Sequence, residues 1–450
     1  MSGEPKSSGP YLLYGLNDRP PAGRTALYAV QWLFFALANS AVVPVVVGGA
    51  LGLDQAGVAA LVQRTFFFQG VASFLQVTAG HRLPIIEGPS GMWWGIFITL
   101  AALAPGLGKP LSALRTDLEL GVMAAGATVL LTGMCGFVGR ARRLFTPPVT
   151  GSVLVLLGIQ LSGTFVKGML GLGSGGLVDG RACLVSLAAI TAVVLVSLKA
   201  RGFGKSLAVL AGIAAGWLAA VPAGLAGGGA GRETARFIVL PELFAFGPPT
   251  FDGGVVLACV LTGLLVLSNL VASIMAMEKA LGIELPPKTY DRGVSLTGVA
   301  DILAGAGATV GFVPYSAGAA MVGITGVASR LPFALFALAL AVLGLLPAVA
   351  AILASIPEPA GYSVLLASFC QMVAFGLKDY ARTALDERDS FVIGLTLLFG
   401  TGVMFLPPAV LAGLPSLVRY ILGNGFLCGM LVCLLLEHIL LPKKFFGQKN

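Results

Sequence analysis

The feature that most constrains this chain is its long series of apolar runs, each about 20 residues in length, separated by short polar segments. A run of that length crosses the hydrocarbon core of a bilayer as one helix. Of the 450 residues, 57% are hydrophobic and 11% are charged, whereas soluble domains carry roughly 25% charged residues. The sequence therefore predicts an all-α polytopic membrane protein.

The apolar runs predict fourteen transmembrane segments in two sets of seven. The first set lies within residues 25–224 and the second within 254–441, and a glycine- and proline-rich linker at 225–253 joins them. Residues 1–24 and 442–450 flank the two sets. In chain order the expected segments cover residues 25–49, 55–79, 84–104, 119–138, 147–165, 182–200, 205–224, 254–277, 294–309, 314–328, 331–355, 360–377, 390–406 and 415–441.

The basic residues predict the orientation of the chain. The net charge is +8, but lysines and arginines occur singly or in small groups between apolar runs, which argues against a nucleic-acid partner. Most of them fall on the inner side if both termini are inside, as the positive-inside rule requires. We therefore expect an integral protein of the cell (cytoplasmic) membrane with cytoplasmic N- and C-termini. The six cysteines show no metal-binding spacing, so no metal site is predicted.

Two apolar runs are interrupted at corresponding places in the two sets. The stretch Gly298–Arg330 contains Gly311, Pro314 and Gly318 in its middle, and the motif PIIEGPSG begins at Pro84. Proline and glycine disfavour continuous helix, and irregular backbone survives in a membrane only where protein or a water-filled cavity satisfies it. We therefore expect short extended segments followed by half-helices near 84 and 314, and a binding site between them.

Four stretches resemble the nucleobase–ascorbate transporter family of proton- or sodium-coupled uracil, xanthine and uric acid carriers. They are YGLNDRPP (14–21), FTPPVTGSVLVLLGIQLSG (145–163), FGPPTFD (246–252) and GITGVASR (323–330). The resemblance implies two inverted repeats of seven segments, with short strands before half-helices 3 and 10. Segments 1–4 and 8–11 would form a core domain and segments 5–7 and 12–14 a gate domain, with the substrate between the two strands.

The resemblance also implies a set of substrate-binding residues. Trp93 matches the family's aromatic position and would stack on a flat base. The chain departs from the family where Ser268 replaces a glutamate, where Ala317 and Gly318 replace Glu or Gln followed by Asn, and where Gln31-Trp32 replaces Gln-His. The expected binding residues are Glu87, Gly88, Ser90, Gly91, Trp93, Ser268, Asn269, Tyr315, Ser316, Ala317 and Gly318.

Three charged residues fall inside or at the edge of apolar runs and are candidates for coupling transport to an ion gradient. Glu87 precedes the first break, and a carboxyl at membrane depth is by default functional; the alternative is a glutamate that reaches the interface. Arg64 lies deep in segment 2 and is expected to pair with Glu87, for coupling or for structure alone. Asp301 either caps the start of segment 9 or carries a proton or cation.

These observations predict a secondary active transporter of a nucleobase-like heterocycle, working by proton symport and alternating access. A proton or sodium gradient would be the driving force, with no cofactor. No nucleophile–base pair is recognisable, so we do not expect an enzyme. Two alternatives remain: an anion transporter or channel of the sulfate-carrier type, and a non-transporting membrane sensor. Family members commonly form homodimers through the gate domain.

Overall fold

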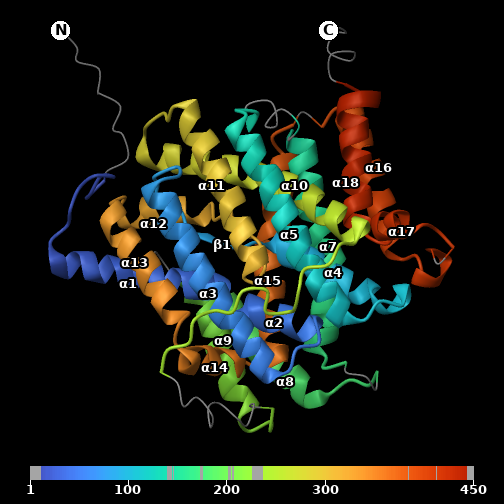
Figure 1. The fold of residues 1–450 in the computed structure, drawn as a ribbon, viewed down its shortest axis with the longest axis horizontal. Coiled ribbons are helices and arrows are strands. Elements are labelled where there is room, and N and C mark those ends of the chain that lie inside the picture. Colours follow the sequence, from blue (N-terminus) through green and yellow to red (C-terminus); the bar gives the residue numbers. More distant parts are fainter. Residues whose placement is uncertain are drawn as a thin grey trace.

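The computed structural model of the chain describes residues 12–138, 144, 146–172, 176–200, 204, 207–225, 237–383, 385–411 and 413–442. Helices make up almost all of the described secondary structure, and one two-stranded sheet lies among them (Figure 1). The predicted mostly helical class is therefore confirmed, and the sheet consists of the two short strands expected before the half-helices near 84 and 314.

The elements follow the chain in this order. The first half contains α1 Ala22–Ser40, α2 Val42–Ala50, α3 Gln55–Thr78, β1 Glu87–Pro89, α4 Gly91–Leu103, the 3-10 turn η1 Pro105–Leu107, α5 Leu111–Met134, α7 Pro147–Met169, α8 Gly180–Lys199 and α9 Ala208–Ala220. The second half contains α10 Gly253–Leu281, α11 Pro287–Ala306, β2 Phe312–Pro314, α12 Ala317–Thr325, α13 Arg330–Leu343, α14 Pro347–Ala354, α15 Glu358–Tyr380, α16 Glu387–Met404, the 3-10 turn η4 Pro408–Leu411, α17 Ser416–Leu422, α18 Gly425–Leu435 and the π-helical turn η5 Leu436–Leu440.

Seven spans in the described part of the chain are long and apolar enough to cross a membrane, with α1 and α2 taken as one. An eighth is added if the bent pair α13 and α14 counts as a single span. Helix α4 has 13 residues and so extends only about 20 Å at 1.5 Å per residue, less than a bilayer core. The described helices thus confirm a membrane protein, and the count of fourteen crossings stays a prediction.

Several helix boundaries differ from those expected from hydropathy. Helix α5 begins at Leu111 and not at 119, and α11 begins at Pro287 and not at 294, because charged residues near their starts, among them Arg115 and Lys288, lower the hydropathy there. The segment expected at 331–355 bends by 82° between α13 and α14. The segment expected at 415–441 is interrupted at Asn424, whose side chain caps α18.

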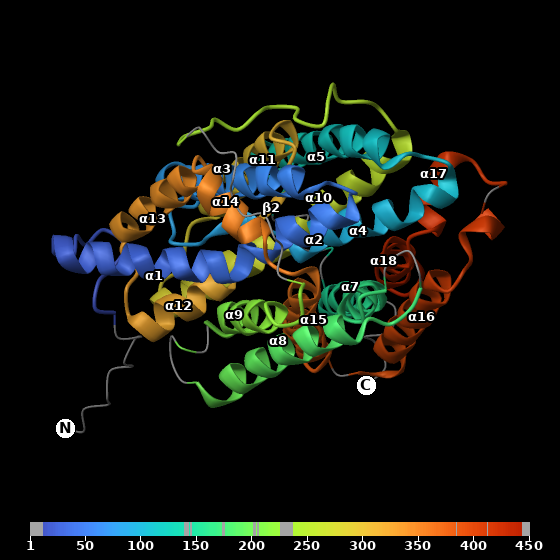
Figure 2. The ribbon, with the colours of Figure 1, turned by 90° about the horizontal axis from the view of Figure 1, so that it is seen from below.

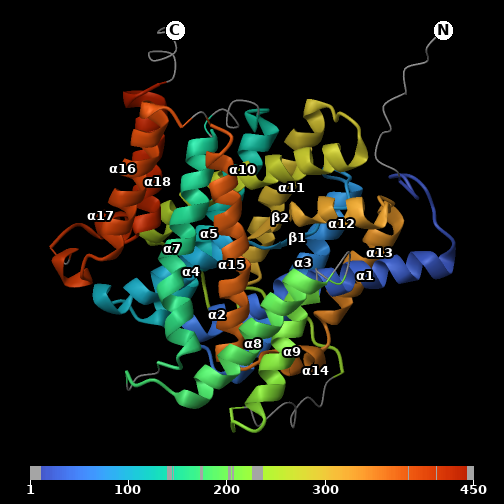
Figure 3. The ribbon, with the colours of Figure 1, turned by 180° about the vertical axis from the view of Figure 1, so that it is seen from behind.

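The helices pack in two groups around the sheet. Helix α5 packs against α10 and α11, and α3 packs against α13 and α14; in the other group α7 packs against α15, α16 and α18, and α8 packs against α9 and α15. Figure 2 shows α1 and α13 at one end of the molecule and α16 to α18 at the other. The strands β1 and β2 lie in the interior between these ends (Figure 3).

Candidate substrate site

The site is organised by β1 and β2, which pair antiparallel with Glu87 opposite Pro314 and Pro89 opposite Phe312. As the sequence predicts, each strand is short and leads into a short helix, α4 or α12. Ser90 joins β1 to α4 and caps the helix, since its hydroxyl accepts a hydrogen bond of 3.2 Å from the amide of Met92. The two breaks predicted from proline and glycine therefore meet in space.

A cavity of about 180 Å³ opens beside the strands. Three of the side chains that line it carry polar groups, those of Asn39, Tyr315 and Ser368. Trp94 and Phe369 form an aromatic wall with their ring centroids 4.7 Å apart. The lining residues come from α1, α2, β1, α4, α9, α15 and the end of β2, and they are Ala38, Asn39, Val42, Val43, Pro89, Gly91, Trp94, Val209, Tyr315, Val364, Leu365, Ser368, Phe369 and Met372.

Tyr315 fixes the shape of the cavity beside β1. Its hydroxyl donates a hydrogen bond of 3.0 Å to the carbonyl oxygen of Pro89 and lies 3.5 Å from the hydroxyl oxygen of Ser40. Ser40 in turn accepts a hydrogen bond of 2.9 Å from Gln69. A Cβ atom at Gly88 would lie 2.5 Å from the Tyr315 hydroxyl, so glycine is required at position 88 for this tyrosine position.

The expected binding residues fall in different places relative to this cavity. Gly91 and Tyr315 line it, whereas Ser316 and Ala317 are exposed outside it and Gly318 is buried near Pro84. On α10, the Ser268 hydroxyl donates to the carbonyl of Leu265, and the Asn269 side-chain oxygen accepts from Ser273. Neither α10 residue lines the cavity, and their contact with substrate stays a prediction.

The aromatic side chain that faces the cavity is Trp94, not Trp93. Trp93 is completely buried and lies over Gly311, where a Cβ atom would come within 2.5 Å of its ring. Successive residues of a helix point about 100° apart, so residues 93 and 94 cannot face the same side. Trp93 therefore does not line this cavity, and its predicted contact with substrate stays a prediction.

Glu87 is the first residue of β1, and its side chain is completely buried. One carboxyl oxygen accepts hydrogen bonds of 2.8 Å from Gln76 on α3 and 2.9 Å from the Thr297 hydroxyl on α11. Its other oxygen has no partner among the described residues. Burial also rules out a glutamate that reaches the interface.

The expected ion pair between Arg64 and Glu87 is absent from the described structure. Glu87 contacts Gln76, and Arg64 lies 12 residues earlier on α3, which is about 18 Å along the helix axis. The guanidinium carbon of Arg64 instead lies 5.3 Å from the centre of the Phe246 ring. The acidic groups that act on its charge are Glu119 and Glu242.

The motif FGPPTFD (246–252) supplies Phe246 beside Arg64, because this segment crosses α3 and α5. The amide of Phe246 donates a hydrogen bond of 3.1 Å to Glu119. The Thr250 hydroxyl donates 2.6 Å to Asp117, and Lys109 binds Asp252 at 2.7 Å. The end of the predicted linker is thus attached to α5 and the residues before it through Glu119, Asp117 and Lys109.

Asp301 lies inside α11, five residues before the helix ends, and does not cap its start. The capping interpretation is wrong because α11 begins at Pro287, well before hydropathy indicates. One carboxyl oxygen of Asp301 accepts a hydrogen bond of 2.7 Å from the amide of Phe312, the first residue of β2. Its second oxygen has no partner in the described part of the chain. Asp301 therefore positions the second strand.

Sequence reasoning missed several residues of the site. Asn39 and Ser368 line the cavity with polar side chains, and Gln76 and Thr297 hold Glu87. A signal exists for some of them: Asn39 and Ser40 are adjacent polar residues inside an apolar run, which is costly in a bilayer unless they have partners. Phe369 and Met372 carry no such signal, since apolar residues on a membrane helix also face lipid.

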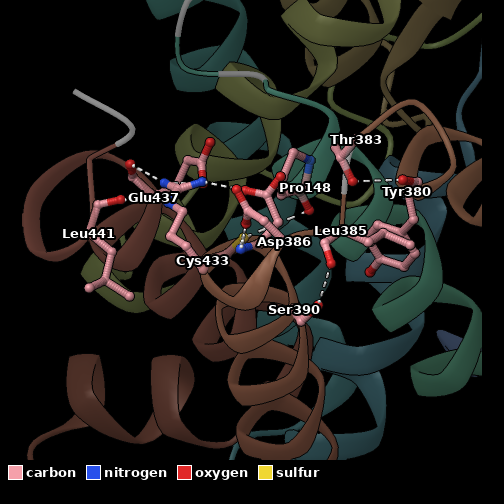
Figure 4. Close-up of polar contacts among 11 residues, drawn as sticks. Pro148, Tyr380, Thr383, Leu385, Asp386, Ser390, Cys433, Glu437 and Leu441 are labelled. Atoms are coloured by element: carbon pink, nitrogen blue, oxygen red, sulfur yellow. Dashed lines mark hydrogen bonds and ion pairs between the residues drawn. The ribbon is translucent and has the colours of Figure 1, made fainter. Parts of the chain in front are cut away.

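A separate ionic cluster lies away from the cavity, where α16 meets the end of α18 and η5. The Arg388 guanidinium binds Asp389 at 2.7 Å and Glu437 at 2.6 Å, and all three side chains are at most 3% exposed. Arg388 also donates 2.7 Å to the carbonyl of Leu441. Figure 4 shows Glu437 and Leu441 beside Asp386 at the start of α16. The described residues contain no cluster of His, Cys, Asp or Glu side chains that could hold a metal ion.

Sequence comparisons with known proteins match most of the chain. The model of the Permease family Xan_ur_permease matches residues 23–409. The chain is 31% identical over 429 residues to YwdJ of Bacillus subtilis (strain 168), named as a candidate purine permease, covering 94% of this chain and 97% of that protein. It is 27% identical to the uric acid permease PucK of the same organism, covering 95% and 98%.

A solved structure with a similar fold is the transmembrane domain of the cyanobacterial bicarbonate transporter BicA. Its TM-score is 0.63 at 14% sequence identity, covering 92% of this chain and 98% of that domain. At that identity the likeness concerns the fold alone. The family model and the permease relatives decide the assignment: the chain is a permease, a transporter and not an enzyme, and it belongs to the nucleobase–ascorbate transporter family.

Proposed function

We propose that this protein carries a nucleobase, of the purine, xanthine or uracil type, across the cell membrane by alternating access. The two relatives are named as a candidate purine permease and a uric acid permease, and the cavity beside β1 suits a flat heterocycle. Trp94 and Phe369 offer aromatic faces, and Asn39 and Ser368 offer hydrogen-bonding groups. Stacking of a base on an aromatic side chain contributes about 1–3 kcal/mol in single-strand binders, enough to select planar solutes.

The observation that carries this proposal is the combination of aromatic walls with two nearby helix N-termini. Gly91, the first residue of α4, and Tyr315, two residues before α12, both line the cavity. Amides at a helix N-terminus carry partial positive charge and attract electronegative atoms such as the carbonyl oxygens of a base. An inorganic anion could bind these amides but could not stack on the aromatic walls. The site therefore favours a base over an inorganic anion.

The proposed architecture has fourteen segments in two inverted repeats, with the core and gate domains implied by the family resemblance. The packing of α5 with α10 and α11, and of α7 with α15, α16 and α18, supports this division. The cavity lies where α1, α2 and α4 face α9 and α15. Rocking of one group against the other would expose it to each side in turn. Both termini are then cytoplasmic, and two copies associate through the gate domain.

Proton symport is the proposed driving force, with Glu87 as the proton carrier. A buried carboxyl without a cation beside it favours its neutral form, because isolated charge is costly in an apolar interior. Glu87 lies one residue before Gly88, which contacts Tyr315 of the cavity wall. A movement of Tyr315 in the cavity wall can therefore be transmitted to the Glu87 carboxyl through β1, without another element between them. In the absence of a segment 8 glutamate, Glu87 takes over its role.

A thermal-shift screen of the purified full chain tests the substrate. Xanthine, hypoxanthine and uracil are compared with bicarbonate and sulfate, and we expect at least one base to raise the melting temperature, since ligands that bind the native state stabilise it. Trp94→Ala should lose that increase. Stabilisation by an anion and by no base would support the anion transporter instead, and no stabilisation by any base would contradict the proposed substrate class.

A further inference from the structure

A second and larger cavity, of about 600 Å³, lies away from the substrate site and shares no residue with it. We call it the arginine cavity, because three of its ten lining residues are arginines. It is formed by the segment before α1, the end of α3, the loop after α3 and the start of α13. Its lining residues are Leu16, Asn17, Asp18, Arg19, Val77, Thr78, Arg82, Arg330, Leu331 and Ala334.

The arginine cavity is built by docking of two motifs that are far apart in sequence. Tyr14 of YGLNDRPP forms a parallel bridge with Val327 of GITGVASR. The Ser329 hydroxyl donates a hydrogen bond of 2.6 Å to the carbonyl of Asp18. The Arg330 amide donates 3.1 Å to the carbonyl of Leu16. The walls are therefore fixed by backbone contacts and do not depend on a ligand.

The charge of the arginine cavity is strongly positive. Arg330 donates to the side-chain oxygen of Asn17 at 2.7 Å and to the carbonyl of Arg82 at 2.6 Å, which brings two guanidinium-bearing residues together. No ion pair is found for Arg19, Arg82 or Arg330 in the part of the chain that the structure describes. The one acidic lining residue, Asp18, accepts a hydrogen bond of 2.8 Å from the Gly15 amide.

The helix dipole of α13 also favours an anion at this place, and the loop backbone around Arg82 is held in a fixed conformation. Arg330 and Leu331 are the first residues of the 14-residue helix α13, so the positive end of its dipole adjoins the cavity. Arg82 has a φ angle of 59°, a conformation that costs free energy for residues other than glycine. This backbone is held by hydrogen bonds from the Arg82 amide to the Gln76 carbonyl at 3.0 Å and from Arg330 to its own carbonyl.

An exposed apolar stripe continues from the arginine cavity along α13. Leu331, Leu335, Leu338 and Val342 are 39%, 43%, 46% and 54% exposed. Their spacing of four, three and four residues places them on one face of the helix. From Leu331 to Val342 the stripe extends about 16 Å, close to half of the 30 Å hydrocarbon core of a bilayer. A positively charged cavity at the end of an apolar stripe of this length matches the headgroup and the acyl chain of a lipid in one leaflet of the bilayer.

We propose that the arginine cavity binds the phosphate-bearing headgroup of an anionic phospholipid, with an acyl chain along the α13 stripe. Arginine recognises phosphate through paired N–H groups in a planar fork. Basic cavities between membrane helices bind anionic headgroups. The apolar stripe favours a lipid over a free phosphate, because a free phosphate has no apolar group to pack against the stripe.

The test compares melting of the delipidated full chain in micelles with added phosphatidylglycerol or phosphatidylcholine. The wild type should be stabilised more by phosphatidylglycerol. Arg19→Gln with Arg82→Asn should lose more than half of that difference, and asparagine tolerates the φ angle at position 82, so the variant should fold. The control variant Lys288→Gln with Arg292→Gln removes two exposed charges at the start of α11 and should keep the whole difference.

Two further probes distinguish the source of the phosphate. Inorganic phosphate and glycerophosphoglycerol, a headgroup without acyl chains, should not reproduce the stabilisation at millimolar concentration. If either does, the cavity takes a soluble phosphate and the lipid assignment is wrong. If the Arg19 and Arg82 variant keeps the full lipid-specific difference, or the wild type shows none, these arginines hold no anion and the proposal is overturned.

Discussion

At the scale of single residues, two buried carboxyls stand at the two strands of the site. Glu87 is the first residue of β1, and Asp301 accepts the amide proton of Phe312, the first residue of β2. Each has one oxygen without a hydrogen-bond partner among the described residues. Glu87, the proposed proton carrier, and Asp301 thus occupy comparable positions beside the two strands.

The first prediction separates the structural and coupling roles of Glu87. Glutamine keeps the shape of the side chain, so Glu87→Gln should melt close to the wild type. In proteoliposomes it should still exchange base across the membrane but lose accumulation driven by a proton gradient, because an amide carries no exchangeable charge. The exposed Glu284→Gln is the control. If Glu87→Gln accumulates base as the wild type does, Glu87 is structural and Asp301 becomes the coupling candidate.

The second prediction concerns the adjacent tryptophans of α4. Trp94→Ala should weaken base binding by about 1–3 kcal/mol, roughly 5- to 150-fold, since it removes the stacking surface. Trp93→Ala should instead lower the free energy of unfolding by about 3–5 kcal/mol, because it leaves a hole in the core over Gly311. Calorimetric binding and thermal melting measure the two effects. Equal loss of affinity in both variants, at equal stability, would contradict the assigned orientations.

At the scale of elements, close contacts between helices explain why glycine occurs inside α5 and α11, where a larger side chain would not fit. A Cβ atom at Gly126 of α5 would lie 2.7 Å from the Gly298 carbonyl of α11, and one at Gly305 would lie 2.7 Å from the Glu119 carbonyl. Small residues of this kind let membrane helices approach closely, where van der Waals packing replaces the hydrophobic effect. This contact holds Thr297 and Asp301 at fixed distances from the strands.

The third prediction tests the ionic cluster of α16 and η5. Arg388→Leu should destabilise the protein by about 3–5 kcal/mol, because it leaves Asp389 and Glu437 buried without their cation. Combining it with Asp389→Asn and Glu437→Gln should restore part of the loss. Melting of the purified variants measures both changes. An Arg388→Leu protein as stable as the wild type would show that the cluster is hydrated and not buried.

At the scale of the whole molecule, the sequence predicts the class and the position of the breaks but not the contacts between distant side chains. Pro84 and Pro314 mark both strands because proline cannot continue a helix. The predicted pairing of Arg64 with Glu87 is wrong, because Glu87 contacts α3 at Gln76 and Arg64 lies about three turns away along that helix. Asp301 is misassigned because a polar first turn hides the start of α11 from hydropathy. Which tryptophan faces the cavity depends on the helix start, which is known only to within a residue or two from sequence.

The arrangement of the whole molecule gives the cavity its proposed role. Its lining residues come from both groups of helices, with Gly91 and Tyr315 on one side and Phe369 on the other. In the proposed alternating-access mechanism, a solute held there would contact both groups and so couple its binding to their relative movement. The aromatic side chain of Phe369 is the closest approach of α15 to position 91.

The central claim is that this cavity holds the transported base, and equilibrium binding to a cavity-filling variant tests it most directly. A Cβ atom at position 91 would lie 3.2 Å from the Phe369 ring, so the side chain of Gly91→Ile must occupy the cavity. Binding of the base identified by the screen is measured by calorimetry for this variant and for Gly394→Ile, where the structure shows open space. We predict at least about tenfold weaker binding, or 1.4 kcal/mol, for Gly91→Ile and unchanged binding for Gly394→Ile; wild-type affinity in a folded Gly91→Ile protein would contradict the claim.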